Sequence, residues 1–139
     1  MKNKRKIPKK GQSLVEMALI VPILLLLLSG ILDLGRLYYV FVVVTDAAGE
    51  GAVYGASNPT DTAGIQTRAA EATEGLVSID TSNVTVTCAT CPDPQSGDEI
   101  AVTVEYDFVT LTPFIGALMP DGVIPLTATS TEVILGGQP

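Results

Sequence analysis

The chain has 139 residues, enough for one small domain with an appendage, and its charges are unevenly distributed. Six of the eight Lys and Arg residues lie within residues 1–10, and all fifteen acidic residues follow, so residues 11–139 carry a formal charge of −13. Binding to nucleic acid needs clustered Lys and Arg, so a segment this acidic excludes nucleic acid as a partner. The chain contains no histidine, which excludes His-based catalytic relays and His-ligated metal sites.

The first predicted element is a membrane-spanning helix. Residues 17–32 contain no charged side chain, and the apolar character continues to Val44, interrupted only by Asp33 and Arg36. Sixteen helical residues extend about 24 Å, slightly less than the roughly 30 Å hydrocarbon core. Basic residues precede this run and none follows it directly, which predicts a cytoplasmic N-terminus and an exterior body. A cleaved signal peptide is the alternative, but the apolar run is too long and no small-residue cleavage site follows it directly.

Asp33 and Arg36 lie three positions apart, so they share one helix face and are predicted to form an ion pair near the outer edge of the membrane. Beyond them the apolar positions continue at helical spacing, past the length that a bilayer covers. This stripe predicts a protein partner and consists of Leu34, Leu37, Tyr38, Phe41 and Val44.

A more specific motif precedes the helix. The basic leader ends at Gly11, and four uncharged residues separate that glycine from Glu16. This arrangement resembles a prepilin-peptidase site, with cleavage between Gly11 and Gln12, where glycine lets a protease approach the backbone closely. In the pilin pattern, the glutamate at the position of Glu16 neutralises the terminal amine of a neighbouring subunit.

The longer string from Gly11 to Pro22, the leucine run after it and the residues from Asp33 to Arg36 resemble the TadE-like pseudopilin family of the tight-adherence (Flp) pilus system. The resemblance implies processing by a prepilin peptidase and a single-pass stage in the bacterial inner membrane, with the body outside. It further implies a final location in a cell-surface pilus or envelope apparatus. The implied partners are copies of the chain or other pilin-like subunits, the peptidase and a pilus assembly platform. Major and minor subunit roles both remain open.

The chain is predicted to comprise a basic leader at 1–11, a hydrophobic helix at 12–57 and an extracellular body at 58–139. The fold class is α+β and pilin-like, with a long N-terminal helix, a short second helix and an antiparallel sheet of about three strands. The long helix extends about 68 Å, is kinked by Pro22 and ends before Pro59. Near its end, small side chains are predicted to leave a flat face for another backbone, namely Ala48, Gly51, Ala52, Gly55 and Ala56.

Within the body, residues 62–75 are predicted to form the short helix, capped by Asp61 or Thr62, with apolar side chains at positions 65, 69, 72 and 76. Alternating residues predict strands at 84–88, 100–108 and 123–134. The uncharged segment 112–120 is predicted to be a turn or short helix that covers a sheet edge or touches the long helix.

Cys88 and Cys91 are predicted to form a disulfide, because their number is even and the exterior is oxidising. Redox activity, metal binding and free thiols are the alternatives. A redox pair usually lies at a helix N-terminus, and zinc needs two further ligands. The acidic residues between Asp93 and Asp107 do not have the spacing of a calcium loop. We therefore predict no cofactor, no metal site and no catalytic residue.

These patterns predict a structural subunit, not an enzyme: a pilin-like protein cleaved after Gly11 and assembled through its N-terminal helix. The alternative is a single-pass, membrane-anchored extracellular interaction module that does not polymerise. In that case the basic leader is an uncut cytoplasmic tail, so the N-terminus of the mature chain distinguishes the two.

Overall fold

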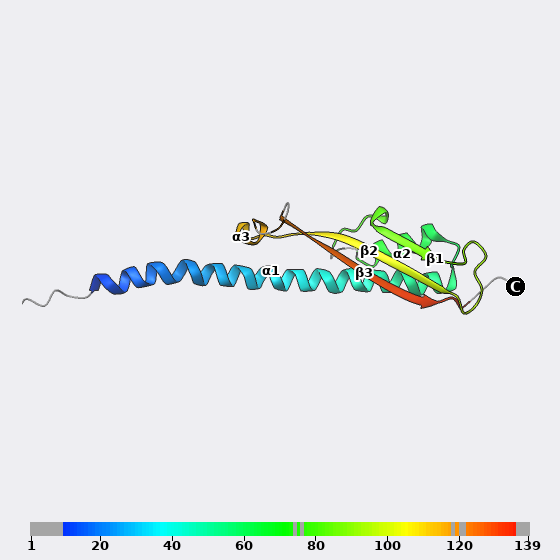
Figure 1. The fold of residues 1–139 in the computed structure, drawn as a ribbon, viewed down its shortest axis with the longest axis horizontal. Coiled ribbons are helices and arrows are strands. Elements are labelled where there is room, and N and C mark those ends of the chain that lie inside the picture. Colours follow the sequence, from blue (N-terminus) through cyan, green and yellow to red (C-terminus); the bar gives the residue numbers. More distant parts are fainter. Residues whose placement is uncertain (1–9, 74, 76, 118, 120–121, 136–139) are drawn as a thin grey trace, which may run out of the picture.

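A computed structural model describes residues 10–73, 75, 77–117, 119 and 122–135 of the chain. It shows one very long helix with a small body packed along its C-terminal half (Figure 1). The predicted α+β fold class is confirmed. The predicted basic leader, apart from its last two residues, lies outside the described residues. In chain order the elements are α1 (Lys10–Ser57), α2 (Thr62–Glu71), the 3-10 turn η1 (Thr81–Asn83), β1 (Val84–Cys88), β2 (Glu99–Val109), α3 (Pro113–Gly116) and β3 (Val123–Val133).

Helix α1 has 48 residues, so it is about 72 Å long. It ends at Ser57, directly before the predicted stop at Asn58 and Pro59. A kink is predicted at Pro22, but α1 continues through this residue and curves only gently (Figure 1). Proline removes a single backbone donor, and the hydrogen bonds of the neighbouring turns are enough to keep the helix continuous.

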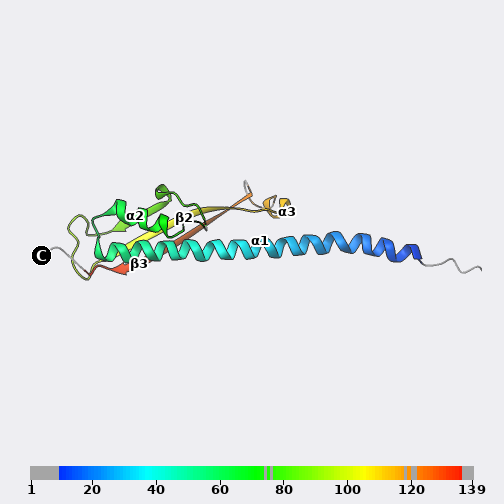
Figure 2. The same cartoon turned by 180° about the vertical axis from the view of Figure 1, so that it is seen from behind.

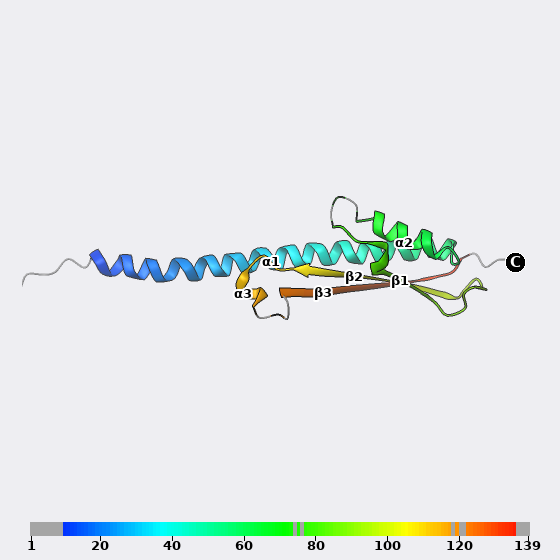
Figure 3. The ribbon, with the colours of Figure 1, turned by 90° about the horizontal axis from the view of Figure 1, so that it is seen from above.

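The sheet is antiparallel with the strand order β1-β2-β3, and its pairing follows from the alternation in the sequence. Val102 lies opposite Val86 on one side and Ser130 on the other. Helices α1 and α2 lie together on one face of the sheet (Figures 2 and 3). The strand residues that are buried against them are Val84, Ile100, Val102, Val104, Phe108 and Ala128. The opposite face is rich in threonine, and the hydroxyls of Thr103 and Thr129 lie 2.9 Å apart across β2 and β3.

The small side chains near the end of α1 pack against the chain's own body. A Cβ atom added to Gly51 would lie 3.1 Å from both Ala69 Cβ and Val102 Cγ1, so α1 approaches α2 and β2 closely here. The predicted flat face therefore exists, but α2 and the sheet occupy it. Its buried members are Ala48, Gly51, Ala52, Gly55 and Ala56.

The chain's own body covers the predicted apolar stripe only in part. Val44 is fully buried against the body and Leu37 is half-buried, whereas Leu34, Tyr38 and Phe41 are exposed. The buried face of α1 instead continues through Val40, Val43, Val44, Ala47 and Ala48. An apolar side chain in this region therefore does not by itself identify the face that contacts the body.

Helix α2 begins at the predicted cap, where Asp61 accepts a hydrogen bond of 3.0 Å from the backbone N–H of Gly64. Ile65 and Ala69 are fully buried, as their spacing predicts. The helix ends at Glu71, four residues before the predicted end, so Ala72 is exposed. The predicted apolar position 76 lies outside the described residues.

Two glycines of α1 provide a test of this packing. Leucine at position 51 would overlap Ala69 and Val102, so Gly51→Leu is expected to destabilise the fold by about 1–3 kcal/mol or more. A Cβ added to Gly49 would meet no atom within 4 Å, so Gly49→Leu is expected to leave stability unchanged or raise it by up to about 1 kcal/mol. Thermal unfolding of both variants in detergent, followed by circular dichroism, measures the difference. Equal melting temperatures would contradict the close packing at Gly51.

Candidate assembly helix and its attachment to the body

The N-terminal half of α1 is apolar on all sides and is not covered by the body. Helix α1 is long and apolar enough to cross a membrane, and none of its most apolar 18-residue window is buried. A helix that is hydrophobic all round requires burial in a protein core or in a bilayer. Because the described part of this chain provides no such core, this half is a candidate membrane span. Its exposed large apolar residues are Leu14, Val15, Met17, Leu19, Ile20, Val21, Ile23, Leu24, Leu25, Leu26, Leu27, Leu28, Ile31 and Leu32.

The residues of the predicted processing and assembly site lie at the start of this exposed half. Gly11, Gln12 and Glu16 are all helical and exposed. Gln12 and Glu16 are four positions apart, so they lie on the same side of α1, one turn from each other. Within the described residues Glu16 has no hydrogen bond or ion pair. Glu16 is also the only charged residue of α1 between Gly11 and Asp33.

Asp33 attaches α1 to the segment that connects β2 and β3. Its carboxylate is buried and accepts hydrogen bonds from the backbone N–H of Leu111 (3.2 Å), the backbone N–H of Thr112 (2.9 Å) and the Thr112 hydroxyl. Arg36 lies 3.5 Å from the carboxylate, and its guanidinium stacks over the Phe108 ring at 5.3 Å. Four hydrogen-bond donors thus surround this carboxylate.

The spacing in the sequence predicted the contact of Asp33 with Arg36 but not those with Leu111 and Thr112. The ion pair is half-exposed on the arginine side and is the longest of the carboxylate's contacts. Backbone N–H groups carry no side-chain signature, and they lie almost 80 positions away in the sequence. In the sequence, Thr112 lies in the uncharged segment 112–120. Its hydroxyl indicates a hydrogen-bond donor there, but nothing in the sequence identifies the acceptor.

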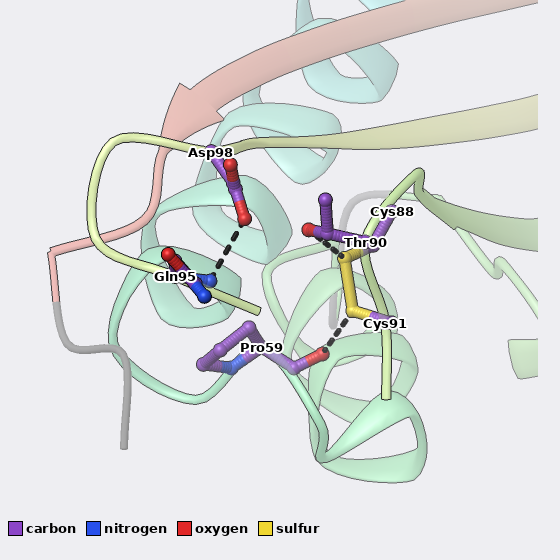
Figure 4. The surroundings of a disulfide bond; sticks show 6 residues. All are labelled: Pro59, Cys88, Thr90, Cys91, Gln95 and Asp98. Atoms are coloured by element: carbon purple, nitrogen blue, oxygen red, sulfur yellow. Dashed lines mark hydrogen bonds between the residues drawn. A yellow bond between two sulfur atoms is a disulfide. The ribbon is translucent and has the colours of Figure 1, made fainter. Parts of the chain in front are cut away.

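At the other end of the body, Cys88 and Cys91 form a disulfide that closes a three-residue separation at the end of β1. Figure 4 shows this bridge beside the chain that follows α1, where Cys91 Sγ lies 3.6 Å from the carbonyl oxygen of Pro59. Cys88 Sγ lies 3.9 Å from the hydroxyl of Thr90. The bridge therefore closes the start of the β1–β2 loop and lies close to the end of the long helix.

The same loop is held by a carboxylate and by the end of β3. The backbone N–H of Gln95 donates to Asp98 at 2.8 Å, and this bond holds the pKa of Asp98 below its usual value (Figure 4). The N–H of Leu135 donates to the carbonyl of Ala56 at 2.9 Å, which ties the end of the sheet to the end of α1. The disulfide is one of several contacts that close this end of the body.

This arrangement predicts a modest effect of removing the disulfide. A loop this short contributes about 2 kcal/mol or less of stability through chain entropy, so the Cys88→Ser, Cys91→Ser double variant is expected to fold with a slightly lower melting temperature. Thiol trapping of the wild-type protein, extracted from membranes without reductant, is expected to find no free cysteine. Two alkylated thiols in the native protein would contradict the assignment.

Among the described residues, no group of three or more Cys, Asp or Glu side chains is placed to hold a metal ion. The arrangement that the chain does provide is an uncovered apolar helix with a carboxylate near its start and a folded body at its end.

No curated protein and no solved structure matches the chain. Residues 11–53 match the model of the family described as TadE-like protein, so the resemblance predicted from the sequence is confirmed and the N-terminal helix of this chain is TadE-like.

Proposed function

We propose that the chain is a pilin-like structural subunit that is cleaved between Gly11 and Gln12 and then assembled through α1. The TadE-like match supports this proposal, since it begins at Gly11 and covers the helix as far as Val53. TadE-like proteins form a pilin-like family of structural proteins rather than a family of enzymes. In this proposal residues 1–11 are the leader, residues 12–57 the assembly helix and residues 58–139 the exterior body.

The observation that carries the proposal is the division of α1 into two halves. From Ser29 onwards one face of the helix is partly or fully covered by the body, whereas residues 11–28 are exposed on every side. An apolar surface of this size needs a bilayer or other helices. A pilin-like subunit meets both in turn, first the inner membrane with its body outside, and later the helices of neighbouring subunits.

The proposed partners are those that act on the helix in the membrane and those that cover it after assembly. A prepilin peptidase removes the leader, an assembly platform extracts the helix, and copies of the chain or other pilin-like subunits cover it. The body remains outside the cell throughout. Assembly then places the chain in a cell-surface pilus or an envelope filament.

The experiment is to express the chain with a prepilin peptidase and an assembly platform, and to examine sheared cell-surface material. Filaments seen by negative-stain microscopy should contain this chain, identified by mass spectrometry, with Gln12 or its methylated form as the first residue. A chain that is recovered only from the membrane fraction, uncut and without filaments, would contradict the proposal. That result would instead favour an anchored exterior module that does not polymerise.

A further inference from the structure

The connection between β2 and β3 reaches further toward the N-terminus of α1 than the rest of the body (Figures 1 and 3). Its contacts are with the helix turn that contains Asp33, which accepts the N–H groups of Leu111 and Thr112. A Cβ added to Gly30 would lie 4.0 Å from Ile115 Cδ1, so α3 packs beside α1 at this level. The connection is therefore fixed to α1 at a defined level along the helix, between Gly30 and Asp33.

This level of α1 coincides with the expected outer edge of the membrane. A hydrocarbon core of about 30 Å takes about 20 helical residues. If the span begins at Glu16, it ends close to Arg36, two turns beyond Gly30. The β2–β3 connection is then at the depth of the outer leaflet's edge, not above it in water.

The chemistry of the connection fits this depth. No charged residue occurs between Asp107 and Asp121. Three apolar side chains at the end of β2 and in the connection are exposed, with 77% of Leu111, 62% of Val109 and 42% of Met119 accessible. Between α3 and α1 lies an apolar groove of about 330 Å³, whose walls include Leu26, Leu34 and Ile115. A water-facing hairpin end of this size would normally carry polar or charged residues.

Of the two charged residues at this level, Asp33 is removed from water, whereas the Arg36 side chain stays half-exposed. Asp33 is buried by Leu111 and Thr112, and Arg36 lies over Phe108. Burying an unpaired carboxylate at a membrane edge costs several kcal/mol, and the hydrogen bonds from the connection offset this cost. The contacts that hold the connection in place thus also make the helix compatible with an apolar environment at Asp33.

We propose that Val109, Leu111, Ile115 and Met119, here called the outer-edge surface, insert into the outer leaflet as a second membrane contact beside α1. The occupant of this surface is lipid, because the surface continues the exposed apolar surface of α1 at Leu26 and Ile31. The inference rests on the proposed membrane span. It assigns the body a fixed depth and orientation on the membrane before assembly.

The chain contains no tryptophan, so a single introduced tryptophan reports its own surroundings. The full chain is reconstituted in phosphatidylcholine vesicles, with and without bromine atoms on the acyl chains, placed near the headgroups in one set and near the chain ends in another. Leu111→Trp tests the outer-edge surface, and Val109→Trp tests it at an independent position. Leu24→Trp, in the exposed half of α1, reports the span. Val133→Trp, 49% exposed at the far end of the sheet, is the water-facing control.

The expected result is blue-shifted emission of Leu111→Trp and Val109→Trp, with a loss of intensity in vesicles brominated near the headgroups that is comparable with that of Leu24→Trp in vesicles brominated near the chain ends. Val133→Trp should keep water-like emission in all vesicle types. If only Leu24→Trp is quenched, the inference is wrong and the membrane span stands. If Leu24→Trp is also unquenched, the span itself is wrong. Blue-shifted but unquenched emission of Leu111→Trp would show that protein covers the surface and would overturn its assignment to lipid.

Discussion

Replacement of Gly11 by leucine is expected to stop processing and to leave the precursor in the membrane. A Cβ added to Gly11 would meet no atom within 4 Å, so the substitution does not disturb the fold of the chain itself. The effect is expected to arise in the peptidase site, where a side chain at the scissile bond displaces the backbone from the catalytic groups. A displacement of about 1 Å can reduce a reaction rate about 10²-fold.

Pulse-labelling of cells with an active prepilin peptidase, followed by mass analysis of membrane-extracted protein, measures the ratio of precursor to mature chain. The wild-type chain should begin at Gln12 and the Gly11→Leu variant at residue 1 or 2. Gly35 provides a matched control, since it also lies on α1 with no atom within 4 Å of a Cβ. Gly35→Leu should be processed at the wild-type rate. An uncut wild-type chain would contradict the cleavage site.

The elements with strong local signals could be predicted from the sequence. The alternation in residues 100–108 defines β2, and the helix stop at Pro59 and the cap at Asp61 both occur where predicted. These features depend on backbone restrictions and side-chain periodicity within a few residues. For the same reason the uncharged run from Met17 identified the exposed half of α1.

The features that the sequence could not predict depend on contacts across the fold. The small residues around Gly51 allow close approach of any backbone, and only the fold shows that α2 and β2 occupy this face. The sequence indicates that Asp33 is half of an ion pair, whereas most of its hydrogen bonds come from Leu111 and Thr112. In both cases the sequence identified an unusual position, but the partner lay far away in the chain or had no side-chain signature.

Removal of the Glu16 carboxylate is expected to prevent assembly without affecting insertion or cleavage. Glu16 is exposed on an apolar part of α1, where a neutral side chain would be better tolerated by the membrane. After cleavage, the positive groups near it are the α-amino groups of Gln12 in its own chain and in neighbouring chains. Loss of one partner from a buried charge pair typically costs about 2–5 kcal/mol, which corresponds to about a 30-fold or greater loss of incorporation.

The measurement compares Glu16→Ala with wild type in the membrane fraction and in sheared filaments. Glu50→Ala is the matched control, because it removes an exposed carboxylate of the same helix whose 3.0 Å ion pair with Arg68 lies on the surface of the body. Glu50→Ala should assemble normally. Glu16→Ala should be inserted and cleaved at wild-type levels and be depleted from filaments, and its presence there at wild-type levels would show that the carboxylate is dispensable.

Co-expression with the wild-type chain then distinguishes the two possible amines. If Glu16 pairs with the amine of a neighbour, a Glu16→Ala subunit still offers its own amine to an adjacent wild-type Glu16. Incorporation of the variant should therefore recover in part as the wild-type share rises. If Glu16 pairs only with Gln12 of its own chain, each variant subunit lacks the pair whatever its neighbours are, and its incorporation should not depend on the wild-type share. The TadE-like character of the helix leads us to expect the first result.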